Sequence, residues 1–185
     1  MDKEPDEALA ERCRRGERSA LEAIVRRYQK PLYNAAFRVV GNAEDARETT
    51  QTVFLRVWER IHDYDPQYRF FSWIYRIAVN ESLDVLRRTR REEPIGDDEE
   101  YLPAGEMADP ARQLDGAQLA RRVQAALDRM KGEDRVVLTL RHFSECSYRE
   151  IADILGIEEK TVKSRLFEAR QRLRVLLEPT DGNRS

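Results

Sequence analysis

The chain has 185 residues, of which 41% are hydrophobic and 37% are charged, and its formal net charge at pH 7 is -2. This length allows one domain or two small ones with modest cores, and the near balance of charge excludes overall basicity as an argument for nucleic-acid binding. The cysteines, Cys13 and Cys146, lie far apart and without metal-ligand spacing to His62 or His142. This spacing indicates neither a disulfide framework nor a zinc site, and we expect neither a metal nor a cofactor.

The amino-terminal half is predicted to be helical throughout. Residues 5 to 40 give two or three helices with a break at Gly16. Asn42, which acidic residues follow, is a good N-cap for a helix that runs to about Ile61. A turn at HDYDPQYR then leads into a long helix from about Ser72 to Arg90.

This long helix has two contrasting faces. Its inner stripe consists of Ile74, Ala78, Ser82 and Val85. The opposite face carries Trp73, Arg76, Asn80, Asp84 and Arg87, and the preceding loop adds Tyr64, Tyr68, Phe70 and Phe71. Aromatic rings interleaved with Arg and Asn suit unstacked bases, which stack on rings while amide and charged groups meet their edges. The alternative is that these aromatics only close the core of a small helical domain.

An acidic stretch separates this half from the next. From Glu92 to Asp109 every charged residue is acidic, and glycines and prolines punctuate the segment. We interpret residues 92–110 as a flexible acidic linker, after which Asp109 and Pro110 form the cap and first turn of a new helix. The predicted fold is all-α, with two small helical domains at 1–91 and 111–178 and a disordered tail at 179–185.

The span from Tyr148 to Arg174 has the pattern of a helix-turn-helix. In its first helix Ile151, Ala152 and Leu155 share an apolar stripe, and Gly156 supplies the positive φ that the turn needs. In its second helix the inner positions are Val162, Leu166, Ala169 and Leu173, which leave Lys160, Lys163, Ser164, Phe167, Glu168 and Gln171 outside. Phe167 has no core to fill on this polar face, which favours a partner surface such as thymine methyl groups in a major groove. An ordinary helical bundle with a solvated basic face is the alternative.

These segments together resemble the bacterial sigma factors of the sigma-seventy family, in particular the extracytoplasmic-function (ECF) group. The resemblance covers almost the whole chain in the family's order. The segments that carry it are DARETTQTVFLRVW at Asp45 to Trp58, FFSWIYRIAVNESLDVLRR at Phe70 to Arg88, the acidic linker, YREIADILG and TVKSRLFEARQRLR. It implies a sigma factor that binds core RNA polymerase and directs promoter-specific initiation, and which is not an enzyme.

The resemblance assigns residues to three surfaces. The surface expected to bind polymerase consists of Glu48, Gln51, Thr52, Leu55 and Arg56, whereas Phe54, Val57 and Trp58 of the same helix are expected in the core. The residues expected to capture the melted non-template strand of the minus-ten element are Tyr68, Phe70, Trp73, Asn80 and Asp84, with Arg76, Arg87 and Arg88 on phosphates. The residues expected at the minus-thirty-five duplex are Lys163, Ser164, Phe167 and Glu168 towards base edges, Arg149, Lys160, Arg165 and Arg170 nearer the backbone, and Thr161 beside them.

The chain departs from the family's pattern at several of these positions. Thr52 occupies a position where many relatives carry Glu, and Glu48 replaces a common Asp. The contact with polymerase is therefore expected to be organised differently at these two residues. Lys131 and Lys160 replace a usual Pro and a frequent Gly. Glu168 stands where relatives often have a basic residue. A carboxylate repels phosphate and accepts hydrogen bonds from the cytosine amino group, which predicts an uncommon minus-thirty-five sequence.

The partners implied by the resemblance are macromolecular. They are core RNA polymerase, through the clamp helices of the largest subunit and the flap of the second-largest, promoter DNA, and an anti-sigma factor. No paired catalytic carboxylates, activated nucleophile or Gly-rich phosphate loop is found in the sequence, and we expect no small-molecule substrate. The charged amino terminus does not fit a signal peptide, and no segment approaches about 20 apolar residues, so we expect a cytoplasmic protein.

Two other functions fit parts of the sequence. One is a helix-turn-helix regulator with an amino-terminal sensing or dimerising domain, which would bind a palindromic duplex as a symmetric dimer without polymerase. The face of Trp73, Asn80, Asp84 and Arg87 argues against it, because a sensing domain does not need such a surface. The other is an adaptor that binds only the polymerase clamp.

Overall fold

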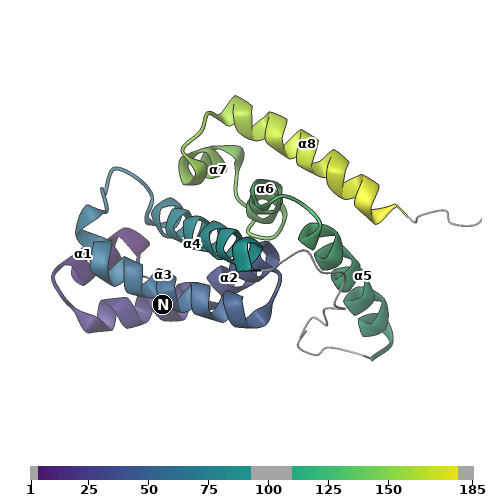
Figure 1. Cartoon of the computed structure of the whole chain (residues 1–185). Helices are drawn as coiled ribbons and strands as arrows, with labels where there is room; N and C mark the ends of the chain where they lie inside the picture. The colour runs from purple at the N-terminus through teal and green to yellow at the C-terminus, as the bar shows by residue number, and fades with distance from the viewer. Residues whose placement is uncertain (1–3, 93–109, 179–185) are drawn as a thin grey trace, which may run out of the picture.

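The computed structural model describes residues 4–92 and 110–178, and every regular element in these two ranges is a helix (Figure 1). In chain order the helices are α1 (Asp6–Arg14), α2 (Arg18–Val40), α3 (Ala43–Arg60), the 3-10 helix η1 (Ile61–Asp63), α4 (Phe70–Glu92), α5 (Pro110–Asp128), α6 (Gly132–His142), α7 (Tyr148–Leu155) and α8 (Glu159–Leu177). The all-α prediction is confirmed for these residues. Most of the predicted linker and all of the predicted tail lie outside them.

Local signals set the helix boundaries of the amino-terminal half. Gly16, with a φ of 82°, separates α1 from α2 as predicted. Residues 5–40 therefore form two helices, and α2 continues through Pro31 to Val40. Asn42 is the N-cap of α3, where its side chain accepts a hydrogen bond of 2.8 Å from the Asp45 backbone N–H. This bond satisfies one of the donors that the first turn of a helix leaves free.

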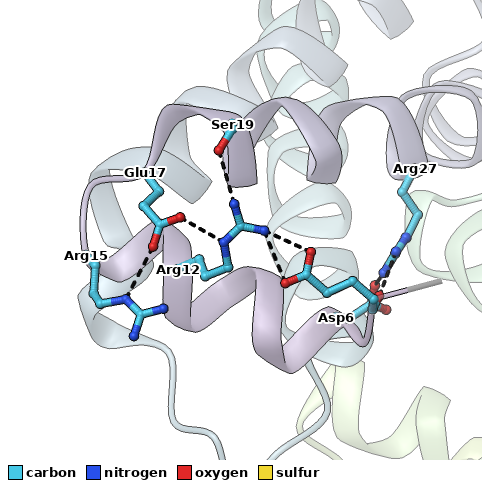
Figure 2. A network of polar contacts seen from close by, with 7 residues as sticks. Asp6, Arg12, Arg15, Glu17, Ser19 and Arg27 are labelled. Carbon is cyan, nitrogen blue, oxygen red and sulfur yellow. Dashed lines mark hydrogen bonds and ion pairs between the residues drawn. The ribbon is translucent and has the colours of Figure 1, made fainter. Parts of the chain in front are cut away.

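A network of polar contacts ties α1 to the start of α2 (Figure 2). The Arg12 guanidinium donates to the Glu17 carboxylate at 2.8 Å and to the Ser19 hydroxyl at 3.1 Å. At the other end of α1, Asp6 accepts hydrogen bonds from Arg27 and from the Tyr28 hydroxyl. These contacts fix the short α1 against α2, and none of them involves a residue of the expected binding surfaces.

The core of the amino-terminal half is built around Phe70 at the start of α4. Its ring is fully buried and lies edge-on to Tyr28 and Tyr64, with centroids 6.0 and 5.4 Å apart. The predicted inner stripe of α4 is confirmed, since Ile74, Ala78 and Ser82 are buried and Val85 is half-buried against a second apolar cluster. The helix thereby presents its other face outward.

The carboxy-terminal half contains the helix-turn-helix that the sequence predicts. Ser147 and Glu150 form a capping box at the start of α7, and Gly156 ends that helix with a φ of 65°. Of the predicted inner residues of α8, Val162, Leu166 and Ala169 are buried, and Leu173 is half-buried against the core. On α7, Ile151 is buried as expected, but Ile154 is the second buried residue, whereas Ala152 and Leu155 are half-buried.

The two halves pack against each other through α6, which lies beside α2 and α4 (Figure 1). Val136 and Leu140 of α6 face Val39 of α2 and Val79 of α4 across a narrow apolar gap. Arg135 adds a polar tie, because its guanidinium donates to the Val39 carbonyl at 2.8 Å. A single hydrophobic cluster therefore extends through both halves. Among the described helices, none is both long enough and apolar enough to cross a membrane.

Candidate nucleic-acid interface

Helix α8 presents an exposed face that combines one aromatic ring with charged and polar groups. Phe167 is 64% exposed and contributes nothing to the core, because the buried residues of α8 lie on its opposite side. Lys163, Ser164, Arg165 and Glu168 are exposed as well. The other expected residues of this surface, Arg149, Lys160 and Arg170, are exposed, and Thr161 is half-buried. The predicted outward face of the second helix is therefore available to a partner.

Several side chains of this face already have partners. The Ser164 hydroxyl donates to the Thr161 carbonyl at 3.0 Å, and the Lys163 ammonium lies 3.4 Å from Glu159. Arg170 donates to Nε2 of His142 at 3.2 Å, so that this histidine accepts as a neutral ring. Burial lowers the pKa of His142, and the positive charge of Arg170 lowers it further. The face keeps its charges but holds several of them in defined positions.

Glu168 belongs to a chain of ion pairs that was not predicted from the sequence. Its carboxylate accepts a hydrogen bond of 3.0 Å from Arg172, one turn further along α8. The other amino group of Arg172 is bound by both carboxylate oxygens of Asp134 on α6, at 2.8 and 2.9 Å. The pair of Glu168 and Arg172 could be predicted from the sequence, because residues four apart on a helix are neighbours. The contact of Arg172 with Asp134 could not, because it spans 38 positions in the chain.

A second surface lies at the amino-terminal end of α4 and in the loop before it. Tyr68, Trp73 and Asn80 line one hollow together with Arg76 of α4 and Asp153 of α7. Tyr68 is 64% exposed, and Trp73 is half-buried against Tyr64 and Phe70. An exposed phenol ring, an indole and an amide around one hollow are groups on which a base can stack and to which it can hydrogen-bond.

Phe70 differs from the rest of this expected set. Its side chain is fully buried, and its ring packs against that of Trp73 with the centroids 5.6 Å apart. A base cannot reach it in this arrangement, so its observed contribution is to support Trp73. Further along α4, Asp84, Arg87 and Arg88 are exposed, and Asp84 and Arg87 form an ion pair of 2.8 Å with each other.

A third surface lies on α3. Glu48, Gln51, Leu55 and Arg56 are exposed, and Thr52 is half-buried. Arg56 is held by ion pairs to Glu59 at 3.2 Å and to Glu81 of α4 at 3.4 Å. The expectation that Trp58 belongs to the core was wrong, because this residue is 40% exposed. Since Leu55 and Trp58 are three residues apart on a helix, these two exposed apolar side chains lie on the same face of α3, which we call the patch of Leu55 and Trp58.

Helix α7 covers part of the α4 surface (Figure 1). The Arg76 guanidinium donates to the backbone carbonyls of Asp153 and Ile154 at the carboxyl end of α7. Arg69 forms an ion pair with Glu150 at the other end of the same helix. These contacts occupy Arg76, which was expected to bind phosphate.

Glu150 also serves as the capping residue of α7. Burial acts to raise its pKa, but the hydrogen bonds from Ser147 and the charge of Arg69 outweigh burial, so that the pKa lies below its usual value. The two expected DNA surfaces meet nearby, since Asn80 and Arg165 line one hollow between the halves. This arrangement brings together residues that were assigned to different promoter elements.

Comparison with known protein families gives one match in each half of the chain. Residues 24–92 match the family model of Sigma-70 region 2, and residues 120–173 match that of Sigma-70, region 4. The chain belongs to the sigma-70 family. The ECF RNA polymerase sigma factor SigE of Mycolicibacterium smegmatis is 36% identical over 82% of this chain, which spans 59% of that protein's length. The RNA polymerase sigma-H factor of Pseudomonas aeruginosa is 28% identical over 97% of both chains.

Solved structures of sigma factors share the fold. CnrH, solved in complex with the cytosolic domain of CnrY, is 25% identical with a TM-score of 0.69 over 94% of this chain and 97% of CnrH. The sigma factor RpoE of Bartonella quintana, solved with the anti-sigma factor NepR, has a TM-score of 0.67 at 21% identity over 86% of this chain and 97% of RpoE. The predicted membership of the ECF group is thus confirmed by curated relatives, and sigma factors are initiation factors rather than enzymes.

The family regions place the three surfaces within this sigma factor. The α3 and α4 surfaces both lie in region 2, and the exposed face of α8 lies in region 4. One match falls in each half of the chain, while the predicted domain limits of 1–91 and 111–178 remain a prediction. No group of His, Cys, Asp and Glu suited to a metal ion occurs within residues 4–92 and 110–178.

Proposed function

We propose that this sigma factor binds core RNA polymerase in the cytoplasm and directs initiation at promoters that it recognises through two separate contacts. The exposed ring of Phe167 within the polar face of α8 carries the proposal. A large apolar side chain that is 64% exposed on a helix-turn-helix favours a partner surface. Membership of the sigma-70 family makes promoter DNA that partner.

The first contact is the duplex of the minus-thirty-five element. Lys163, Ser164, Phe167 and Glu168 of α8 face the base edges of the major groove, where Phe167 meets thymine methyl groups. Arg149, Lys160, Arg165 and Arg170 lie on the flanks of this face with Thr161, where the basic groups bind phosphates and fix the register. The Glu168 carboxylate makes this sigma factor select a cytosine at the base pair that it faces.

The second contact is the melted non-template strand of the minus-ten element. Bases stack on Tyr68 and Trp73, and Asn80 hydrogen-bonds their edges in the hollow that these residues line. Phe70 supports Trp73 from the core, and Asp84, Arg76, Arg87 and Arg88 lie along the strand's path on α4. Each stacked base returns about 1–3 kcal/mol. Since opening costs about 1.4 kcal/mol per base-pair step, two or three captured bases hold a short bubble once polymerase supplies the rest.

Polymerase binds the α3 surface in this proposal. The patch of Leu55 and Trp58 supplies apolar contact area to the clamp helices, and Glu48, Gln51 and Arg56 surround it with polar groups, while the half-buried Thr52 lies at its edge. Region 4 meets the flap of the second-largest subunit. An anti-sigma factor is the expected inhibitor, and CnrH, which is similar to this chain, was solved in complex with another protein, the cytosolic domain of CnrY.

Promoter binding requires the two halves to separate. In the compact arrangement Arg76 is engaged by α7, and Asn80 shares a hollow with Arg165. Each base pair of a spacer adds about 3.4 Å of duplex, so a spacer of ten pairs already separates two promoter elements by about 34 Å. The α4 and α8 surfaces reach both elements only after α7 leaves α4, and the intervening linker then keeps the effective concentration of the second contact high.

Run-off transcription tests the proposal. Core RNA polymerase, with and without this sigma factor, transcribes a pool of promoter fragments, and the transcript starts are sequenced. Starts that depend on the protein and share two upstream elements at fixed spacing are expected. If no new start appears while the protein alone protects a palindromic duplex, an ordinary regulator is the correct function. Polymerase binding without any promoter preference would indicate an adaptor.

A further inference from the structure

The Glu168 carboxylate is held by Arg172, which is not among the residues expected to contact the promoter. Arg172 lies one turn beyond Glu168 on α8 and donates to its carboxylate at 3.0 Å. A glutamate that precedes an arginine by four residues is the favourable order for such a helical pair. On an exposed helix, such a pair alone contributes little and leaves both side chains mobile.

Asp134 changes this situation, because it anchors the arginine from a second helix. Both carboxylate oxygens of Asp134 accept from one amino group of Arg172, at 2.8 and 2.9 Å, and the Asp134 side chain is only 12% exposed. Asp134 lies in the first turn of α6, where the helix dipole stabilises its negative charge. The guanidinium plane is thereby fixed on the body of region 4, and its other amino group points at Glu168.

Fixing the arginine has two consequences for Glu168. The carboxylate is confined to the orientation in which Arg172 can reach it, so that less side-chain entropy is lost when a base binds. The adjacent positive charge also offsets part of the repulsion between the carboxylate and the DNA phosphates. A free glutamate on a DNA-binding face has neither advantage.

We infer that Arg172 is a positioning residue for promoter selection, which holds Glu168 so that its carboxylate accepts a hydrogen bond from one cytosine amino group of the minus-thirty-five element. The inference rests on the proposed function, and it adds Arg172 and Asp134 to the residues that set specificity. In this arrangement both amino groups of Arg172 are engaged by carboxylates, one by Asp134 and the other by Glu168, so its proposed role is positioning rather than phosphate binding. Its effect is therefore confined to one base pair.

The test compares holoenzymes on promoter variants. A promoter selected by the wild-type holoenzyme is changed to all four bases at each minus-thirty-five position, and relative run-off transcription is measured for wild type, E168Q, R172M and D134N. The substitution E168Q identifies the base pair that Glu168 faces. We expect R172M and D134N to lower the preference for cytosine at this same pair by about tenfold, within the range of one specific base contact. Preferences at the other pairs stay within about twofold.

The matched control is Arg174→Met. Arg174 lies on the same helix and forms an i,i+4 ion pair of 3.1 Å with Glu178, and among the described residues no ion pair links it to another helix or to the expected reading face. We expect R174M to leave every base preference unchanged. Because the Arg172 side chain is half exposed, R172M folds, and circular dichroism confirms this before transcription is measured.

Salt dependence separates positioning from phosphate binding. If Arg172 bound a phosphate, R172M would weaken all sequences alike and reduce the salt slope of binding by about 1, and that result would overturn the inference. Unchanged base preferences in R172M would overturn it as well. Failure of the wild-type holoenzyme to start at any promoter overturns the proposed function and the inference together, whereas wild-type starts with unaltered R172M preferences overturn the inference alone.

Discussion

Replacing Arg135 by methionine tests the tie between the two halves of the molecule. The Arg135 side chain is 9% exposed and donates to the Val39 carbonyl at 2.8 Å and to the Met130 carbonyl at 3.2 Å. It also binds Asp128, through the backbone carbonyl and through a carboxylate oxygen at 3.4 Å. The Val39 and Asp128 carbonyls lie at the ends of α2 and α5, where helices leave acceptors without partners, and the Met130 carbonyl lies in the turn between α5 and α6.

Methionine keeps the apolar stem but removes all of these donors. Breaking a buried charged network by removing one partner costs about 3–5 kcal/mol, because the remaining polar groups stay buried without compensation. The expected loss in the free energy of unfolding of R135M is therefore about 3–5 kcal/mol. Asp128 should add a pH dependence, because burial raises its pKa against the opposing effects of Gln124 and Arg135.

Urea unfolding followed by circular dichroism measures the loss. With a slope of about 2 kcal/mol/M for a protein of this size, the midpoint should fall by about 2 M.

A group whose pKa is raised on folding gives stability that is present at low pH and lost as the pH rises. Arg135 lowers the pKa of Asp128, so its removal lets burial raise this pKa further in R135M than in wild type. The deficit in the stability of R135M should therefore shrink when the pH is lowered from 7 towards the usual pKa of an aspartate. The control R60M removes only the exposed ion pair with Asp63 and should cost less than about 0.5 kcal/mol. A deficit of R135M below about 1 kcal/mol at pH 7 would refute the role given to this arginine.

Three further predictions concern single side chains. Phe167→Ala should leave thermal stability within about 0.5 kcal/mol of wild type but reduce sigma-dependent run-off transcription, whereas Phe70→Ala should cost about 3–5 kcal/mol in a melting experiment because its ring is fully buried. Equal destabilisation by both would contradict the assigned surfaces. Cys146 should resist iodoacetamide at pH 8 in the folded protein, since burial raises the pKa of its thiol to about 12, and mass spectrometry of folded and urea-unfolded samples tests this. Glu150→Gln retains the helix cap but loses the charge that pairs with Arg69, so it should lower stability by up to about 1 kcal/mol at pH 7. Because the pKa of Glu150 is lowered on folding, its contribution is present above the usual glutamate pKa and lost as the pH falls below it. A difference from wild type that persisted near pH 3 would count against the pair.

The sequence by itself determined the helices and much of the expected DNA surface on α8. Caps and turns act within a few residues, so Asn42, Ser147 and Gly156 define helix ends wherever the helices pack. The spacing of Val162, Leu166 and Ala169 fixes which side of α8 is buried and therefore leaves Phe167 outside. These features follow from helical periodicity, which needs no knowledge of distant residues.

Only the tertiary structure decided which side chains are free. Among aromatics with similar local patterns, Phe70 is fully buried, whereas Trp58 on α3 is 40% exposed. Arg76 is engaged by α7 through contacts that span more than seventy positions in the chain. Arg172 is anchored by Asp134 across 38 positions. Helical periodicity gives the direction of a side chain relative to its own helix, but the neighbours that it meets depend on how helices distant in sequence pack together.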